Sequence, residues 1–244
     1  MPITIAVSGK GGSGKTSLAA MIIRFLLQRR GKTVLAVDAD PNSCLGLTMG
    51  TPPHGTIAEI REQARAKTPD NTGVSRVQSF EYGIQQAITE AKGFDLLTMG
   101  RPEGPSCYCA ANNLLRQFLN KLSSSYDFVV IDNEAGMEHL SRRTTNNVDF
   151  LFIITEPNPL GIATAKRIVG LVKDLPISAK KIGIIWNRAE SAEDLDGIET
   201  LGCVPFDKAV SDASMQGKTV FDLEETGPAF SAMQKILEQE LNKG

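Results

Sequence analysis

The chain begins with an apolar, β-branched run, Ile3–Val7, which leads after one serine into the segment Gly9–Thr16, read Gly-Lys-Gly-Gly-Ser-Gly-Lys-Thr. This spacing matches a complete phosphate-binding loop, placed as such loops require between a strand pattern and the helical pattern Leu18–Leu27. The glycines let backbone N–H groups surround an anion, while Lys15 supplies a positive charge and Thr16 a hydroxyl for Mg²⁺. We therefore expect a nucleoside triphosphate with Mg²⁺, and a glycine turn without a ligand is the alternative. The expected nucleotide contacts are Gly11, Gly12, Ser13, Gly14, Lys15, Thr16 and Ser17.

Six apolar runs predict the strands of one sheet. They are nearly continuous in Val, Ile, Leu and Phe, as parallel strands covered by helices on both faces should be. Because helical patterns alternate with these runs, we predict an α/β fold with a doubly wound, mostly parallel sheet flanked by helices on both faces. We interpret residues 1–244 as a single domain, in which residues 51–93 form an irregular excursion with a helix over Thr56–Lys67. The predicted strands are Ile3–Ser8, Thr33–Val37, Leu96–Met99, Phe128–Ile131, Phe150–Thr155 and Lys181–Trp186.

Charge and hydropathy argue against two classes of partner. The formal net charge is −2 and the pI about 5.8, so no basic field draws the chain to nucleic acid or to an anionic membrane. No apolar run approaches the roughly 18 residues that span a bilayer, and the first strand leaves no room for a signal peptide, so we expect a cytoplasmic protein. The apolar face of a predicted helix over Pro228–Leu241 carries few cations and is interpreted as core packing, not as a membrane anchor.

Carboxylates follow two of the predicted strands, at the edge where such sheets bind ligands. Asp38 and Asp40 come directly after the second run, and Asp132 ends the fourth run in a pattern of the Walker B type. We expect Asp132 to hold Mg²⁺ through water, and Asp38 to lie near the metal and its waters. A helix N-cap with a solvated neighbour is the alternative for the first pair.

Lys10 narrows the class of phosphate-binding loop. A side chain directly after the first glycine points away from the phosphates of its own loop, and it reaches more easily across a subunit interface. The loop resembles the deviant Walker A motif of the family that includes MinD, ParA, the nitrogenase iron protein and the arsenite pump ATPase. This resemblance implies an ATP-sandwiched homodimer in which Lys10 enters the active site of the partner; a solvated loop lysine is the alternative. It also identifies Asp40 with the switch I aspartate that positions or activates the attacking water. The candidate catalytic residues are Lys10, Lys15, Asp38 and Asp40.

The same resemblance places switch II at Asn133–Leu140, with Gly136 as the backbone sensor of the γ-phosphate. His139, one of two histidines in the chain, invites assignment as a metal ligand. An isolated histidine is more often a structural hydrogen-bonding residue, and we favour that interpretation.

The binding site for the nucleotide base is inferred from a residue at the end of a predicted strand. In related ATPases an asparagine at the end of a buried strand reads the adenine edge, which assigns that role to Asn187, and Arg188 directly after it is also expected to bind the nucleotide. The segment that ends in Pro205 and Phe206 is expected to wall the base. ATP is preferred to GTP, because Asn187 is not followed by the Lys-x-Asp of a guanine signature.

A Cys-x-Cys pair, Cys107 and Cys109, follows the third predicted strand. Two thiols cannot close a tetrahedral site, but a two-fold dimer would join two pairs into a four-cysteine site for Zn²⁺ or Ni²⁺. The two other cysteines, Cys44 and Cys203, are interpreted as small buried residues.

Four motifs together resemble the CooC-type nickel-insertion ATPases that mature carbon monoxide dehydrogenase, and relatives that act on acetyl-CoA synthase. The resemblance spans essentially the whole chain and implies a homodimeric, ATP-dependent metallochaperone for such a nickel enzyme, with Ni²⁺ or Zn²⁺ at the shared cysteines. The alternatives are an Fe–S electron-transfer ATPase, which would need a cysteine in switch II, and a positioning ATPase of the MinD or ParA type, which would need a basic patch or a membrane helix. The motifs are Lys10-Gly-Gly-x-Gly-Lys-Thr, Asp38-x-Asp40-Pro-Asn-Ser-Cys44-Leu-Gly, Cys107-Tyr-Cys109 and Ala135-Gly-x-Glu-His-Leu.

Overall fold

The strands of the computed structural model form one eight-stranded sheet in the order β3-β4-β2-β5-β1-β6-β7-β8. All neighbours run parallel except β3 and β4, which pair antiparallel at one edge. The structure describes residues 2–66, 76–101, 122, 125–133, 147–174, 178–193, 195 and 197–242. The strands are β1 (Ile3–Gly9), β2 (Val34–Ala39), β3 (Thr89–Glu90), β4 (Phe94–Thr98), β5 (Phe128–Asn133), β6 (Asn147–Thr155), β7 (Ser178–Asn187) and β8 (Glu199–Val204).

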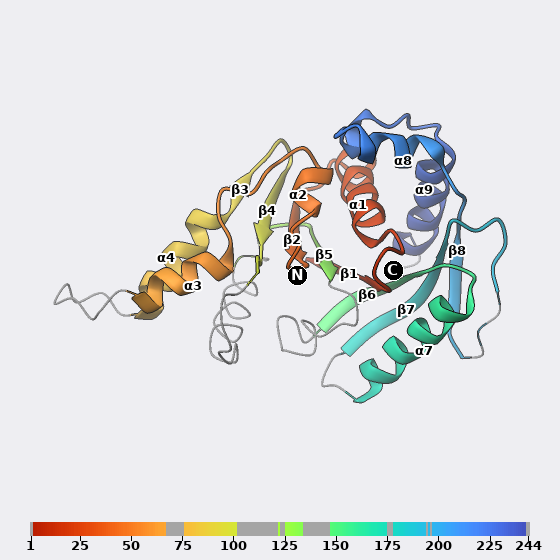
Figure 1. The fold of residues 1–244 in the computed structure, drawn as a ribbon, viewed down its shortest axis with the longest axis horizontal. Coiled ribbons are helices and arrows are strands. Elements are labelled where there is room, and N and C mark those ends of the chain that lie inside the picture. The colour runs from red at the N-terminus through yellow and green to blue at the C-terminus, as the bar shows by residue number, and fades with distance from the viewer. Residues whose placement is uncertain are drawn as a thin grey trace.

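Helices cover both faces of this sheet, as Figure 1 shows. On one face α1 packs over the centre of the sheet and α9 packs beside it against the edge strand β8; their buried side chains form one apolar cluster with those of β1, β2 and β5. On the other face α7 packs against β6 and β7, around the buried ring of Trp186. The described helices are α1 (Lys15–Arg30), α2 (Leu45–Thr48), α3 (Ile57–Ala66), α4 (Arg76–Ala87), α7 (Pro159–Asp174), α8 (Lys208–Met215), the 3₁₀ helix η1 (Val220–Asp222) and α9 (Pro228–Leu241). No helix in these described ranges has the length and apolar character to cross a membrane.

The predicted α/β fold with a mostly parallel, doubly wound sheet is confirmed, and each of the six predicted strands overlaps an observed one. The predicted helix over Pro228–Leu241 is confirmed at both ends, and its apolar side chains face the core. The excursion over 51–93 is more regular than expected, because α4 and β3 follow α3 within it. In α4, Gly83 is a close-packing position and not a helix break: a Cβ there would lie 2.5 Å from Cγ2 of Ile60 on α3.

The C-terminal elements are fastened to α1 by a buried arginine. The Arg24 guanidinium donates hydrogen bonds to the carbonyl oxygens of Val220 and Leu223, at 2.7 and 2.8 Å. It also lies 4.3 Å from the centre of the Phe230 ring on α9, a cation–π arrangement. Since α1 begins at the glycine-rich loop, this packing gives the loop a rigid base.

Candidate phosphate and magnesium site

The glycine-rich loop ends at a helix start that is open to an anion. Gly14 is the N-cap of α1 with φ 90°, a left-handed conformation that glycine adopts without strain, and it provides no side-chain cap. The first turn of α1 contains no acidic residue. The N–H groups and the positive end of the helix dipole are therefore left for a bound anion, as in phosphate-binding loops.

The two lysines of the loop differ in their surroundings. Lys15 is 6% exposed, and its Nζ donates to the carbonyl oxygen of Lys10 at 3.2 Å. The Nζ of Lys10 is exposed and lies 3.5 Å from the carbonyl oxygen of Gly11. Lys15 therefore lies within the loop of its own chain, where it was predicted to bind phosphate, and the role predicted for Lys10 in a partner subunit stays a prediction.

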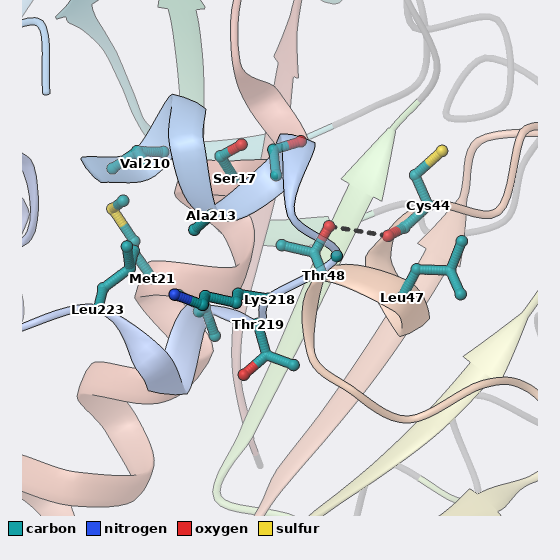
Figure 2. A pocket seen from close by; sticks show the side chains of 13 residues that line it. Ser17, Met21, Cys44, Leu47, Thr48, Val210, Ala213, Lys218, Thr219 and Leu223 are labelled. Carbon is teal, nitrogen blue, oxygen red and sulfur yellow. Dashed lines mark hydrogen bonds between the residues drawn. The ribbon is translucent and has the colours of Figure 1, made fainter. Parts of the chain in front are cut away.

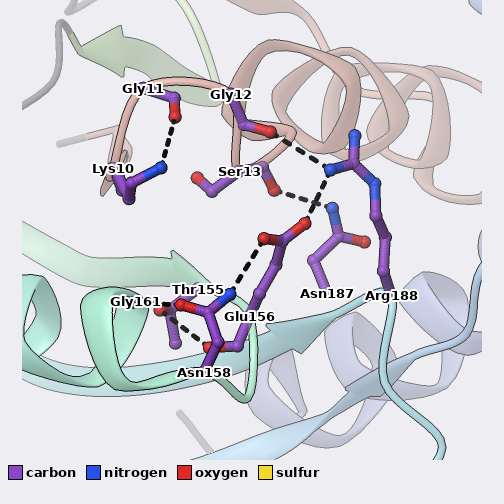
Figure 3. A network of polar contacts seen from close by, with 10 residues as sticks. All are labelled: Lys10, Gly11, Gly12, Ser13, Thr155, Glu156, Asn158, Gly161, Asn187 and Arg188. Atoms are coloured by element: carbon purple, nitrogen blue, oxygen red, sulfur yellow. Dashed lines mark hydrogen bonds and ion pairs between the residues drawn. The ribbon is translucent and has the colours of Figure 1, made fainter.

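Two adjacent residues at the end of β7 hold the outer side of the loop (Figure 3). The Nδ2 of Asn187 donates to the carbonyl oxygen of Ser13 at 2.7 Å, and Nη1 of Arg188 donates to that of Gly12 at 3.2 Å. A Cβ on Gly14 would lie 2.3 Å from this Nδ2, so only glycine permits the approach. One edge of the Asn187 amide is thus engaged by the loop, and its predicted contact with adenine stays a prediction.

Arg188 has a strained backbone and an ionic partner. Its φ of 55° is unusual for a residue with a side chain and costs roughly 1 kcal/mol. Nη1 of Arg188 lies 2.6 Å from Oε1 of Glu156, directly after β6. The sequence analysis gave no role to Glu156; the available signal was a carboxylate directly after a buried strand.

Asp132 is a buried carboxylate on the opposite side of the loop, with 1% of the residue exposed. Among the described residues, none is a hydrogen-bond partner of ordinary geometry for either of its oxygens. Burial raises the pKa of Asp132 to about 7; the Thr16 hydroxyl and the Lys15 ammonium oppose this shift, and the charges of Asp38 and Asp40 add to it. Two unpaired carboxylate oxygens beside a P-loop threonine fit Mg²⁺, which binds through one or two carboxylates together with phosphates and water.

Asp38 is held by backbone groups. It lies beside Asp132 in the register of β2 and β5, and its oxygens accept hydrogen bonds from the N–H groups of Leu45 at 2.8 Å and Asp40 at 3.2 Å. Burial raises the pKa of Asp38 to about 6, and these N–H donors oppose the shift. Asp38 therefore fixes the loop that carries Asp40. The Asp40 carboxylate accepts hydrogen bonds from the backbone N–H and the side-chain amide of Asn42, each at 2.9 Å.

A cavity of about 370 Å³ lies beside the loop, between α1, α2 and the segment from α8 to η1 (Figure 2). Its wall includes Ser17, which was predicted to contact nucleotide, and Cys44. The prediction that Cys44 is buried is wrong: the residue is exposed, at the N-cap of the short helix α2. Partial burial of the thiol raises its pKa, as do the charges of Asp38, Asp40 and Asp132. Cys203 is half-buried.

The predicted base wall follows β8, whose last residue, Val204, pairs with Asn187. Phe206 is 60% exposed, which leaves an aromatic face beside the end of β7. Asp207 fixes this turn, because its carboxylate accepts hydrogen bonds from the N–H groups of Ala209 and Ala229. The structure thus brings Pro205 and Phe206 to the strand ends that carry Asn187 and Arg188.

Four predicted positions lie outside the described residues: Cys107, Cys109, Gly136 and His139. Their assigned roles stay predictions. In the part of the chain that is described, no group of three or more His, Cys, Asp or Glu side chains is arranged to hold a metal ion by itself.

Comparisons with known proteins agree with this geometry. Residues 4–220 match the family described as the CobQ/CobB/MinD/ParA nucleotide binding domain. The chain is 38% identical to a protein of Methanocaldococcus jannaschii described as an uncharacterized ATP-binding protein, over 98% of both chains. It is 34% identical to the carbon monoxide dehydrogenase accessory protein CooC of Rhodospirillum rubrum, over 90% of this chain and 89% of that protein.

Solved structures show the same fold. The cell division ATPase MinD of Pyrococcus furiosus superposes with a TM-score of 0.70 at 22% identity, over 100% of both chains. A ParA family ATPase from Chlorobium tepidum superposes with a TM-score of 0.73 at 20% identity, over 96% of this chain and 98% of that one. With the phosphate cradle, the open N-terminus of α1 and the family match over residues 4–220, the chain belongs to the CobQ/CobB/MinD/ParA nucleotide-binding family.

Proposed function

We propose that the protein is a Mg²⁺-dependent ATPase that works as a homodimer and couples ATP hydrolysis to nickel insertion into a nickel enzyme of the carbon monoxide dehydrogenase or acetyl-CoA synthase type. The observation that carries the ATPase part is the buried Asp132 carboxylate, with two unpaired oxygens beside Lys15 and Thr16. A buried unpaired charge is costly, and a site that keeps one is poised for a cation.

The described residues divide the work of hydrolysis. Lys15 and the N-terminus of α1 bind the phosphates, while Thr16 and Asp132 would hold Mg²⁺, which neutralises charge on the transferred phosphoryl group when bound. Asp40 lies on a loop clasped by Asp38 and orients the water whose oxygen bonds to the γ-phosphorus as the bond to ADP breaks. Lys10 completes the site of the partner subunit.

A single substitution separates binding from hydrolysis. Asp40→Ala is expected to keep ATP bound with less than a threefold change in Kd and to lower kcat by at least a hundredfold, because positioning of the water contributes to the transition state and not to binding. Hydrolysis at the parent rate would exclude Asp40 from this role.

The nickel part of the proposal rests on two supports. One is the 34% identity to a relative whose name describes a carbon monoxide dehydrogenase accessory protein. The other is the Cys107-x-Cys109 pair, two soft ligands that a two-fold axis would double into a site for one Ni²⁺ or Zn²⁺. The nickel enzyme would be the client that receives the ion.

The test is metal content measured in anaerobic size-exclusion peaks after Ni²⁺ or Zn²⁺ is offered, with mass from light scattering. One ion per dimer in the parent, lost in Cys107→Ser, is the expected result. Cys44→Ser is the matched control, because it removes an exposed thiol outside the pair and should retain the ion. Metal that survives Cys107→Ser, or a dimer that binds none, would remove the nickel function and leave the ATPase assignment standing.

A further inference from the structure

The strand ends beside the glycine-rich loop form a continuous polar network that nucleotide contacts alone do not require (Figure 3). From the loop outward it runs from the carbonyl oxygen of Gly12 to Arg188, then to Glu156 and to Asn158. Asn158 ends the network at α7, where its Oδ1 accepts from the N–H of Gly161 at 2.8 Å. The β6 end, the β7 end and the loop are thus linked through side chains.

This network holds two consecutive peptide groups of the loop. The peptide between Gly12 and Ser13 is held at both ends: Arg188 binds its carbonyl, and its N–H donates to the carbonyl oxygen of Lys10 at 3.2 Å. In the next peptide Asn187 binds the carbonyl of Ser13. Because the C=O and N–H of a trans peptide point in opposite directions, this bond turns the N–H of Gly14 toward the inner side of the loop, where an anion would bind.

Arg188 needs a partner to stay on the loop. Its side chain is 47% exposed, and a guanidinium near a phosphate site is attracted to the phosphate itself. The Glu156 carboxylate is 29% exposed and lies 2.6 Å from the same Nη1 that binds Gly12. It neutralises the guanidinium and directs it at the carbonyl.

We propose that Glu156 is a positioning residue of the nucleotide site, which acts through Arg188 to keep the glycine-rich loop in its phosphate-binding shape before the nucleotide arrives. The inference rests on nucleotide binding by the loop and is independent of nickel. The loop then pays less ordering entropy on binding, and ADP and ATP benefit equally because both present phosphates to it.

The experiment measures Kd for Mg-ADP and Mg-ATP by titration calorimetry with the full-length protein. Glu156→Ala should weaken both nucleotides by about three- to tenfold, the range for a charge-assisted contact that is partly exposed to solvent. Glu156→Gln keeps an acceptor without the charge and should lose less. At saturating ATP, kcat should change by less than twofold, since the residue shapes the empty loop and touches no reacting atom.

A double-mutant cycle decides whether Glu156 acts through Arg188. In an Arg188→Met background, Glu156→Ala should have less than a twofold further effect on Kd, whereas a general structural role would give additive losses. The matched control is Glu225→Ala, which removes a partly exposed carboxylate from an arginine, Arg29, fourteen residues along α1 from Lys15 and so about 21 Å away. Its Kd values should equal those of the parent.

Three results would overturn the assignment: additive losses in the cycle, unchanged binding in Glu156→Ala, or tighter binding, which would mean that the freed guanidinium contacts phosphate. A parent protein that binds no nucleotide would overturn the proposed ATPase function and this role with it. Binding by the parent with no effect of Glu156→Ala overturns this inference alone.

Discussion

The two halves of the sheet edge that carries the site differ in how their polar groups are satisfied. On the side of β6 and β7, side chains of the protein already bind the carbonyl oxygens of Gly12 and Ser13. On the side of β5, both oxygens of Asp132 and Oδ1 of Asn133 are buried and have no hydrogen-bond partner of ordinary geometry in the part of the chain that the structure describes. In the first half, protein side chains hold the carbonyl oxygens of the loop; in the second half, buried acceptor oxygens face the position proposed for Mg²⁺.

This difference matches the two tasks that we propose for the site. A phosphate cradle gains affinity when its N–H groups are oriented in advance, because the loop then loses little freedom on binding. A metal position must keep its carboxylate unpaired, which lowers the stability of the empty protein until the ion arrives. The paired half therefore contributes stability to the apo protein, and the open half reduces it.

The largest expected effect comes from Lys15, which lies between the two halves. Lys15→Ala should weaken Mg-ATP and Mg-ADP by at least about a hundredfold, because a buried ammonium that faces the phosphates is lost. Isothermal titration checks this, with Lys208→Ala as the control, a lysine of an exposed ion pair on α8. Retained nucleotide binding in Lys15→Ala would contradict the assignment of the loop.

An intermediate effect is expected on the paired half. Asn187→Ala should lower the free energy of unfolding of the apo protein by about 1–2 kcal/mol, since a buried carbonyl of Ser13 loses its donor. Nucleotide affinity should fall as well. Denaturant unfolding measures the first quantity, and an unchanged midpoint would show that water replaces the amide without cost.

The smallest effect has the opposite sign and concerns the open half. Asp132→Asn should raise the free energy of unfolding of the apo protein by about 1 kcal/mol at pH 7.5, because it removes a buried unpaired charge. Thermal unfolding should show a rise of about 2–4 °C. The same variant should lose the extra stabilisation that Mg²⁺ gives with nucleotide. Destabilisation of the apo protein would mean that Asp132 has a structural partner and would end the contrast between the two halves.

Only some of the contacts that distinguish the two halves of the sheet edge could be predicted from the sequence. The loop, Asp132 and Asn187 follow from motif and strand pattern, because local spacing alone brings them to the carboxyl edge of a parallel sheet. The pairing of Arg188 with Glu156 depends on the order of β6 and β7 and on the positive φ of Arg188, which no local pattern encodes.

Two local structures went unpredicted for physical reasons. The helix α4 contains Gly83, which lowers helix propensity but allows α3 to approach closely. Cys44 is exposed in the turn that is hydrogen-bonded to Asp38 through the N–H of Leu45. The general tendency of cysteine to be buried therefore does not apply there.

The edge strand β3 has a consequence for behaviour at high concentration. It has two residues and runs antiparallel to β4, so it presents very few unpaired backbone groups to another chain. Long, open edge strands template intermolecular pairing and seed aggregates, and a short edge strand is one way in which natural sheets prevent this. At this edge the protein is therefore guarded against the growth of a continuous sheet from one molecule into the next.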